Sequence, residues 1–444
     1  MRKNVQLDLQ GKPVLGKLQI TLVAVYNEIP SHSPAYALSV NPVQAFSMTC
    51  SLNIADIAGM PGELGCDSQQ TAPHNMSPIR LGFVGLSANG WAASTIVPPL
   101  LEDPLSSKYT ITAVSTTNPT SAAASAEKYG KVLSVPVKGY HGSTEGIAKD
   151  PNVDMVAISV RTPGHVEAAL PVLQAKKDLF IEWPAGKKLA GTTEIAEAAR
   201  KNGVRTLVGF QTRQAAYVRK IKEILDSGVL GRIVSTSLVT CMCFPGVRGP
   251  ETLEAYSYII DAANGATIVD IDGGHLVDVL HYLFGPIASI TSYLSNQYPT
   301  TQMFDASGKA VGEPVPQSDI HQAVFGGQFG NKDGTVLSVS IRNVLSEHSA
   351  GLFWVIDGEK GAIKIRAEGE KHRSFMKSEP ELWLNGDKID VETDSEAQRA
   401  ARYWQTFADG REGEYATIED ALQTKKVVDA IFTSNREGRR VDLL

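Results

Sequence analysis

The sequence has few cysteines, no long apolar run and no excess of positive charge. Its four cysteines in 444 residues are Cys50, Cys66, Cys241 and Cys243, and their spacing matches neither a disulfide framework nor a zinc site. No stretch reaches the roughly 18 consecutive apolar residues of a membrane span, and the N-terminal residues lack the pattern of a signal peptide, a charged region followed by a long apolar core and a cleavage site. A net charge of −6 gives no whole-chain attraction for nucleic acid or an anionic membrane, although it does not exclude a local basic patch.

These absences predict a cytoplasmic protein with reduced thiols, no metal, no membrane contact and no directly bound nucleic acid. With 43% hydrophobic residues the chain can bury substantial cores, and its length suggests two or three domains. We therefore expect its partners to be small molecules or proteins.

Residues 1–77 differ from the rest of the chain. Pro, Ser, Asn and Gln are scattered through them, and "LQITLVAVY" at 18–26 is the only strand-like run. Such a segment ahead of a well-formed strand is typical of a poorly ordered extension. Met76 lies three residues before Ile79, so we predict that residues 1–75 are dispensable for folding, or an artefact of gene prediction.

Short apolar runs alternate with helical stretches from Ile79 onward. Uninterrupted apolar strands joined by helices are typical of a parallel sheet covered on both faces. We predict an α/β fold that begins with a doubly wound Rossmann domain over residues 78–212. The strand-like runs are "IRLGFVG" (79–85), "YTITAVS" (109–115), "VDMVAISV" (153–160), "DLFIEWP" (178–184) and "RTLVGFQ" (205–211), and the helical stretches include 121–130 and 192–203.

The pattern changes after Arg213. Amphipathic helices are predicted, among other places, at 217–231, 273–285 and 417–438, each ending at a glycine. Strands with helices on one side indicate an α+β domain over 213–444 with an open, mostly antiparallel sheet. The predicted strands are 233–243, 288–295, 335–343, 351–367 and 381–386.

The loop after the first strand, in "IRLGFVGLSANGW", is a candidate dinucleotide site. A strand that turns through glycine into a helix can hold a pyrophosphate, because backbone N–H groups and the helix dipole point at it. Ser87 stands where the GxGxxG motif has its second glycine, so an ordinary strand-to-helix turn is an equal alternative. The loop residues expected to contact the cofactor are Gly85, Ser87, Asn89, Gly90 and Trp91.

The end of the second strand bears on the form of the cofactor. An acidic residue there binds the ribose hydroxyls of NAD, but Ser115, Thr116, Thr117 and Asn118 are all neutral. Nothing repels a 2′-phosphate, and no arginine is present to bind one. The cofactor is therefore NAD or NADP, with NADP slightly favoured, and Ser115 and Thr116 are expected to contact it.

Several motifs taken in order resemble the glucose-fructose oxidoreductase and inositol dehydrogenase family, Gfo/Idh/MocA. The likeness runs over residues 79–444. Within the family, "GFVGL" followed by "GW", the "TPGH" turn and "EW" are most similar to the fungal galactose/lactose metabolism regulatory protein branch. The motifs are "VDMVAISVRTPGHVEAALPVL", "LFIEWPAGK", "VGFQTRQAAYVRKIKEILDSGVLGRI", "DIDGGHLVDVLHYLFGPI" and "TIEDALQTKKVVDAIFTSNREGRRV".

The resemblance implies two different functions. One is an NAD(P)-dependent oxidoreductase acting on a sugar, polyol or secondary-metabolite alcohol or ketone. The other is a non-catalytic, dinucleotide-sensing regulator that binds a protein partner and acts in the nucleus as well as the cytoplasm. We favour the enzyme narrowly, because Asp270 and Asp272 have not been replaced by inert residues. Either protein is expected to be a dimer or tetramer formed through the open sheet.

The sequence departs from the family's catalytic pattern at two positions. Family enzymes carry a lysine in an "EKP" motif and an aspartate four residues before a histidine. Here Trp183 replaces the lysine and Ile271 replaces the aspartate, so that only His275 matches. These departures put the family's usual mechanism in doubt.

His275, Asp272 and Asp278 are the candidate catalytic residues. His275 is expected to begin a helix, where the dipole lowers its pKa and favours the neutral ring that accepts a hydroxyl proton. Asp278, one helical turn further on, is expected to orient the ring. Asp272 is expected either to cap the helix or to accept a substrate hydroxyl.

The remaining candidate contacts lie at the ends of the later strands of the first domain. Thr162 and Pro163 are expected near the nicotinamide ribose, and His165 either caps a helix or touches the cofactor. Trp183 is expected to stack on the nicotinamide or on a sugar. Arg213 either pairs with a carboxylate, a phosphate or Glu182, or forms a structural salt bridge. Glu182 completes the predicted cofactor site.

Overall fold

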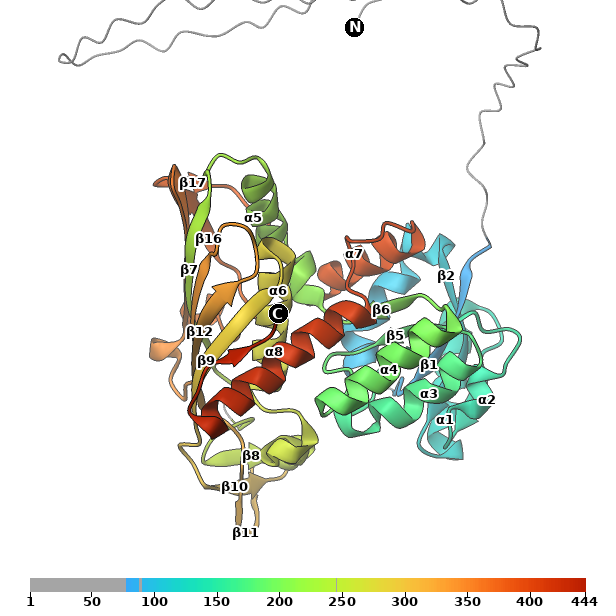
Figure 1. Ribbon diagram of the computed structural model, residues 1–444. Coiled ribbons are helices and arrows are strands. Elements are labelled where there is room, and N and C mark those ends of the chain that lie inside the picture. The colour runs from blue at the N-terminus through green and yellow to red at the C-terminus, as the bar shows by residue number, and fades with distance from the viewer. Residues whose placement is uncertain (1–76, 88–89, 245) are drawn as a thin grey trace, which may run out of the picture. The chain divides into compact units, whose positions relative to one another are not determined.

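The computed structural model describes residues 77–87, 90–244 and 246–444, and the predictions for residues 1–76 and Asn89 lie outside the described residues. The described residues belong to one compact unit, Asn75–Leu444, which Figure 1 shows as a parallel sheet with its helices beside a large open sheet. No helix in this part of the chain is long and apolar enough to cross a bilayer. The predicted fold class is confirmed.

The first half is a six-stranded parallel sheet with the order β3-β2-β1-β4-β5-β6. Its central strands are buried, as their uninterrupted apolar runs predict. Helices connect the strands and cover the sheet (Figure 1). The elements are β1 Ile79–Val84, β2 Tyr109–Thr116, α1 Pro119–Leu133, β3 Lys138–His141, α2 Glu145–Ala148, β4 Met155–Ile158, α3 His165–Gln174, β5 Asp178–Ile181, α4 Leu189–Asn202 and β6 Thr206–Val208.

The chain reverses its direction of winding between β1 and β4. Strands β2 and β3 extend the sheet on one side of β1, and β4, β5 and β6 extend it on the other. Ligands of doubly wound sheets bind in the crevice outside the carboxyl ends of the strands at such a switch point. A ligand is therefore expected at the loops that follow β1, β4 and β5.

The segment after β1 is not a regular α-helix. It forms a π-helical turn at Ala92–Ile96 and then a 3-10 helix at Pro98–Leu101. Two consecutive prolines, Pro98 and Pro99, cannot donate backbone hydrogen bonds, so a helix cannot continue through them. The helix dipole available to a pyrophosphate is correspondingly short.

The second half is a nine-stranded sheet with the order β17-β16-β15-β14-β7-β13-β12-β9-β18. It is mostly antiparallel, as predicted, with one parallel pair between β7 and β13. A small sheet of β11, β10 and β8 lies at one end (Figure 1). The elements are α5 Ala216–Asp226, β7 Ile233–Met242, β8 Glu251–Leu253, α6 Gly274–Phe284, β9 Ile287–Ser295, β10 Thr300–Phe304, β11 Ala310–Pro316, β12 Gln322–Phe329, β13 Val336–Asn343, β14 Gly351–Gly358, β15 Gly361–Glu368, β16 Glu381–Leu384, β17 Asp387–Ile389 and β18 Val441–Asp442.

Two C-terminal helices return to the parallel sheet. Helix α7, Glu396–Ala408, packs against the parallel sheet. Its Tyr403 and Trp404 rings contact Phe180 of β5. Helix α8, Ile418–Glu437, lies between α4 and β9 (Figure 1). Capping boxes at Ser395 and Thr417 start both helices. The last 50 or so residues thus join the two sheets into one body.

Candidate functional site

The loop after β1 makes the sharp turn that the glycine pattern predicts. Gly85 has φ +90°, and a Cβ at this position would lie 2.2 Å from the Ser159 carbonyl oxygen, so only glycine fits. Gly90 faces Ser87, whose Oγ would lie 2.7 Å from a Cβ there. The Ser87 hydroxyl therefore lies inside the turn. A glycine at this position, the second glycine of the motif, would leave that space open.

Trp91 and Glu182 meet across the carboxyl edge of the sheet. The Trp91 indole N–H donates to Glu182 Oε1 at 3.3 Å, although 37% of the Trp91 side chain is exposed. The Glu182 side chain is half-buried, but protein surrounds its carboxyl group, which lies against Gly209. Removal from water raises the pKa of Glu182 to about 8, in spite of the bond from Trp91. Glu182 is thus mainly protonated at neutral pH.

The end of β2 is neutral, as the sequence indicates. Ser115 is buried, and its carbonyl accepts the Gly85 N–H at 2.9 Å. Thr116 shares a 2.6 Å hydrogen bond with the Ser121 hydroxyl, and Asn118 caps α1 through Ser121 N. Of the residues expected to contact the cofactor here, Thr116 is the more accessible.

Trp183 is a packing residue at the junction of the two halves. Its indole N–H donates to the Asp270 carbonyl at 2.8 Å, and its ring lies 4.7 Å from that of Phe210. A Cβ on Gly274 would come within 2.3 Å of the indole nitrogen. With its edge and faces in contact with protein, the ring is held inside the fold, which does not match the exposed stacking surface that the sequence interpretation favoured.

His275 lies in a buried position on α6. Its side chain is 3% exposed, its Nδ1 has no hydrogen-bond partner among the described residues, and its ring meets Phe210 edge to face at 5.4 Å. Burial lowers its pKa to about 3, whereas the helix dipole was the expected cause. His275 is the second residue of α6, as expected, but a π-helical turn at Val269–Gly273 runs directly into this helix, so His275 does not lie at a free helix end.

Asp272 is a buried carboxyl group without a side-chain partner. It is 1% exposed, and no described residue donates a well-formed hydrogen bond to either oxygen, although the backbone amide of Phe375 interacts with it. Burial raises its pKa to about 7, against the opposing charge of Arg248 and the nearby amide of Phe375. The capping alternative is wrong, since neither the π-helical turn nor α6 has a side-chain cap.

Asp278 and Arg213 bind each other. Arg213 Nε and Nη2 donate to the two oxygens of Asp278 at 3.0 and 2.5 Å, and Nη2 also reaches Asp420 at 3.3 Å. The prediction that Asp278 orients His275 is therefore wrong, whereas the pairing of Arg213 with a carboxylate, one of its predicted alternatives, is observed. The structural salt bridge, the alternative for Arg213, is the arrangement observed.

The residues after β4 divide into buried and accessible positions. His165 is buried between two carbonyls, with Nδ1 2.8 Å from Pro184 O and Nε2 2.9 Å from Val160 O. The expected contact of His165 with the cofactor is therefore wrong, because both ring nitrogens face backbone carbonyls inside the protein and the single N–H of the neutral ring donates to one of them. Thr162 and Pro163 lie in a 3-10 turn, Thr162 buried and Pro163 exposed.

Lys425 is a site residue that sequence reasoning missed. From α8 it donates to Asp270 Oδ1 at 2.7 Å, both groups are buried, and its ammonium lies 6.0 Å from the Trp183 ring. Asp270 Oδ2 accepts from Thr267. The pair is 155 residues apart in the chain, so no local pattern could have indicated it.

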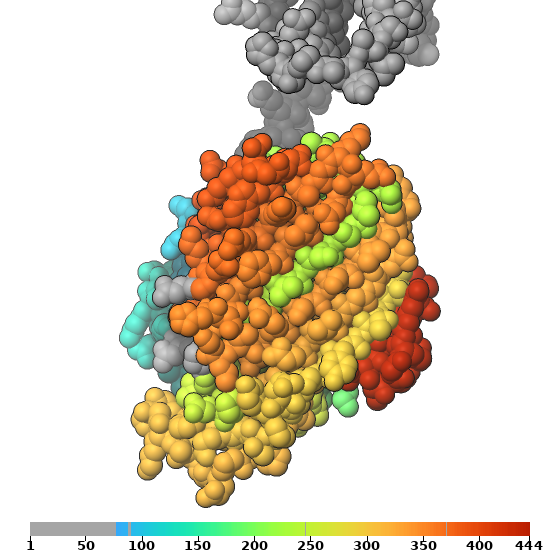
Figure 2. All heavy atoms as spheres, turned by 90° about the vertical axis from the view of Figure 1, so that its left-hand side faces the viewer, coloured from blue at the N-terminus to red at the C-terminus, as the bar shows by residue number. Residues whose placement is uncertain are grey.

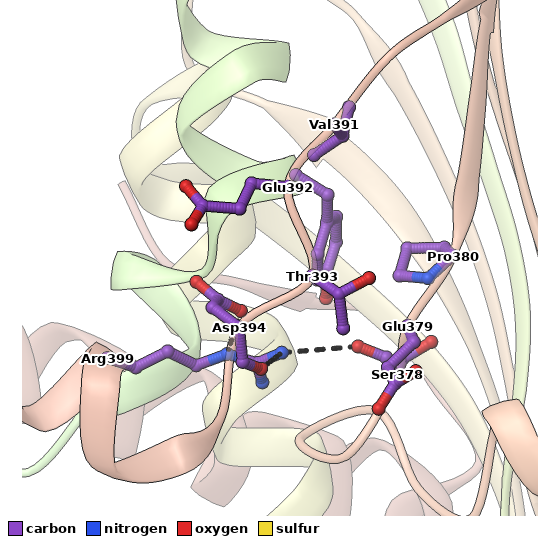
Figure 3. Close-up of a pocket in the computed structure, with 9 residues that line it drawn as sticks. Ser378, Glu379, Pro380, Val391, Glu392, Thr393, Asp394 and Arg399 are labelled. Atoms are coloured by element: carbon purple, nitrogen blue, oxygen red, sulfur yellow. Dashed lines mark hydrogen bonds and ion pairs between the residues drawn. The ribbon is translucent and has the colours of Figure 1, made fainter.

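Two further features of the described residues do not indicate a ligand. The pocket in Figure 3 has a volume of about 20 Å³, room for one water molecule, and the unpartnered Tyr217 hydroxyl lines it. Among the described residues, no group of three or more His, Cys, Asp or Glu side chains is placed to hold a metal ion.

The residues present fit a dinucleotide at the carboxyl edge of the parallel sheet. The turn at Gly85 follows β1, the exposed Trp91 and protonated Glu182 lie beside it, and the switch point adjoins it. Asp272 and His275 supply buried polar atoms without side-chain partners, as expected where a ligand completes a site.

Comparisons with known proteins agree with this arrangement. Residues 79–210 match the model of the oxidoreductase family with an NAD-binding Rossmann fold, and residues 216–367 match the C-terminal domain of Gal80p. Dehydrogenase aclE of Aspergillus oryzae is 34% identical over 375 residues, which cover 81% of this chain and 97% of that protein. The galactose/lactose metabolism regulatory protein of Saccharomyces cerevisiae is 29% identical over 68% of this chain and 69% of its own length.

Solved structures show the same fold. A super-repressor mutant of Saccharomyces cerevisiae Gal80p superimposes with a TM-score of 0.73 at 25% identity, covering 82% of this chain and 98% of that one. Levoglucosan dehydrogenase in complex with NADH and levoglucosan superimposes with a TM-score of 0.66 at 17% identity, covering 82% and 99%, which establishes likeness of fold alone. The chain belongs to the Gfo/Idh/MocA oxidoreductase family and carries a Gal80p-like C-terminal domain.

Proposed function

We propose that this protein is an NAD(P)-dependent dehydrogenase that interconverts an alcohol and a ketone. The observation that carries the proposal is the presence of two buried ionisable groups without side-chain partners, Asp272 and His275, three residues apart on one helical run. Keeping such groups costs free energy of folding, so their retention favours a role with a ligand. The relationship to a dehydrogenase over nearly its whole length supports the same function.

The bound nicotinamide would supply the hydride acceptor or donor. His275 is neutral because burial lowers its pKa, so it can accept a hydrogen bond from the substrate hydroxyl. The pKa of Asp272 is about 7, which suits a group that takes up and returns a proton near neutral pH. We propose that the two groups share the hydroxyl proton, and that Trp183 keeps the π-helical turn in place.

The candidate cofactor contacts are Gly85, Ser87, Gly90, Trp91, Thr116, Thr162 and Glu182. A protonated Glu182 can donate a hydrogen bond to an uncharged nicotinamide amide without repelling the phosphates. The neutral end of β2 accommodates either form of the cofactor, with NADP slightly favoured. We propose a sugar, polyol or secondary-metabolite alcohol or ketone as substrate, and the cytoplasm as the place of action.

A non-catalytic regulator is the second candidate. It is favoured by Trp183, which fills the position of the family's lysine with a ring that cannot move a proton, and by the similarity to galactose regulatory proteins. Such a protein would bind the dinucleotide and a protein partner, in the nucleus as well as the cytoplasm.

We also propose a homo-oligomer that covers the outer face of the nine-stranded sheet, the face shown in Figure 2. Strand register places Tyr293, Val324, Ser340, Val239 and Phe353 opposite one another in a row across five strands. Tyr293 is 71% exposed, and the valines and Phe353 are exposed too. A mostly apolar row of this kind, interrupted by Ser340, is typical of a protein interface.

The test of the enzyme function is turnover. Purified protein would be mixed with NAD or NADP and pooled sugars, polyols and ketones, and the absorbance of the reduced nicotinamide would be followed. We expect turnover that Asp272→Asn and His275→Ala both abolish while NADH fluorescence titrations show unchanged binding. Binding of NADH or NADPH without turnover over a wide panel would favour the regulator, and no binding of either would refute both functions.

A further inference from the structure

Arg161 is an exposed cation at the switch point of the parallel sheet. It follows β4 by three residues, directly ahead of the 3-10 turn at Thr162–Gly164. Its guanidinium lies 5.3 Å from the ring of Tyr258, and its Nη2 makes a long 3.4 Å bond to the Ala255 carbonyl. Among the described residues no carboxylate pairs with it, whereas nearby cations such as Arg213 and Lys425 are fully paired.

Few exposed cations follow the strands at the switch point: Arg161 follows β4, the neighbour of β1, and Lys187 and Lys188 follow β5, one strand further away. The helical segment after β1 is a five-residue π-helical turn broken by prolines, so the dipole that would stabilise a pyrophosphate is short. The end of β2 carries no cation. Because the crevice between the ends of β1 and β4 is where a pyrophosphate would lie, the guanidinium of Arg161 is the charge best placed to bind it.

We propose that Arg161 binds the pyrophosphate of the dinucleotide and that Tyr258 and Ala255 hold the guanidinium while no cofactor is bound. This proposal rests on the proposed binding of a dinucleotide. Tyr258 and Ala255 belong to a 3-10 helix at Glu254–Ile260, in the long segment of the second half that follows β7. Cofactor binding would therefore release a contact between the two halves of the molecule.

The exchange couples cofactor binding to this 3-10 helix. A cation–π contact at an exposed site and a long hydrogen bond are weak, so a charged pyrophosphate can displace them. By linkage, anything that pulls Tyr258 away from Arg161 favours the cofactor, and anything that holds the pair together opposes it. In an enzyme this coupling sets the order in which cofactor and substrate bind. In a regulator it releases the segment 254–260 from Arg161 when the dinucleotide binds.

The test is NADH titration, followed by fluorescence, of the full chain and four single variants. Arg161→Ala should raise the Kd about 10- to 100-fold, because it loses a charge-assisted bond. Arg161→Lys should fall between this variant and the wild type, because it keeps the charge but not the fork. Tyr258→Leu should lower the Kd about 2- to 5-fold by freeing the guanidinium, and Tyr258→Phe, which keeps a ring, should leave it unchanged. The double variant of Arg161→Ala and Tyr258→Leu should match Arg161→Ala.

Competition with ADP-ribose shows which part of the cofactor Arg161 contacts. ADP-ribose has the pyrophosphate without the nicotinamide, so Arg161→Ala should weaken it by the same factor as NADH. If wild-type protein binds NADH and Arg161→Ala binds it equally well, the role of Arg161 is refuted and dinucleotide binding stands. If the wild type binds neither NADH nor NADPH, the proposed function fails and this inference fails with it. Equal effects of Tyr258→Leu and Tyr258→Phe would refute the holding role of the ring.

Discussion

Trp183 donates its indole N–H to the backbone carbonyl of Asp270 at 2.8 Å, which ties the residue after β5 to the π-helical turn that leads to His275. A lysine at position 183 would reach into the site as a cation, whereas this ring is buried against Gly274 and Phe210. The buried ammonium in this region comes instead from Lys425, which pairs with the side chain of the same Asp270. Asp270 thus binds the Trp183 indole through its backbone carbonyl and the Lys425 ammonium through its carboxylate.

Replacing Trp183 with phenylalanine should destabilise the fold. Trp183→Phe leaves the buried Asp270 carbonyl without its donor and opens a space beside Gly274, so we expect a loss of about 1–3 kcal/mol in the free energy of unfolding. Denaturant unfolding measures it. The matched control is Trp91→Phe, where the indole is exposed and a change within about 0.5 kcal/mol is expected. Equal effects of the two variants would contradict the packing role of Trp183.

The Arg213 and Asp278 pair should act on stability and not on cofactor binding. Arg213→Met or Asp278→Leu alone leaves an uncompensated buried charge, which costs about 3–5 kcal/mol. The double variant should recover most of this loss, because apolar groups of similar volume replace the pair. Thermal unfolding and NADH titration would be run side by side. A large rise in the Kd for NADH with unchanged stability would show that Arg213 binds the cofactor after all.

Asp272 should make the stability of the protein depend on pH. Its pKa is about 7 in the folded chain and about 3.9 in an unfolded one, so between these values the folded state binds the extra proton. The free energy of unfolding therefore falls as pH rises from about 4 to 7, by up to about 4 kcal/mol. Asp272→Asn lacks this dependence, so it should match the wild type near pH 4 and be more stable near pH 8.

Comparing Asp272→Asn with the wild type cancels the pH dependence that other titrating groups give to the free energy of unfolding. His275, whose pKa burial lowers to about 3, gives the opposite slope between about 3 and 6.5, and it does so in both proteins. Urea unfolding at several pH values from 4 to 8 measures the difference. A stability difference that does not change with pH would mean that Asp272 is not protonated by burial.

The row of exposed residues on the large sheet should control assembly. Tyr293→Asp combined with Val324→Asp places two charges opposite each other at the β9 and β12 end of the proposed interface, so we expect an oligomer to become a monomer in sedimentation. Val132→Asp on α1 changes an exposed residue elsewhere and should have no effect. A wild-type protein that sediments as a monomer would refute the proposed interface.

The local sequence pattern missed β3 and predicted that α5 ends at Gly231, whereas this helix ends at Asp226. The pattern was sufficient for the other five strands of the first half and for α4, α6 and α8. Their hydrophobic periods and terminal glycines are set by neighbours within one or two turns. The pattern did not reveal α7, although its capping box at Ser395 and its apolar face at Tyr403 and Trp404 were signals that it carried. The irregular segment after β7, with β8 and its 3-10 turns, had no repeating period from which to predict it.

The candidate site was likewise predictable from the sequence in part. The sequence alone named Asp272 and His275 as candidates three residues apart, but it predicted that the helix begins after Asp272, whereas the structure has both residues on one helical run. The sequence could not identify the partners of Arg213, Asp270 and Trp183, because the partners lie in distant parts of the chain. Arg213 pairs with Asp278, and Asp270 pairs with Lys425. Trp183 packs against Gly274. Burial depends on that packing, and burial raises the pKa of Asp272 and lowers that of His275. The types of the site residues were therefore readable from the chain, whereas their charges and partners were decided only when distant segments removed them from water.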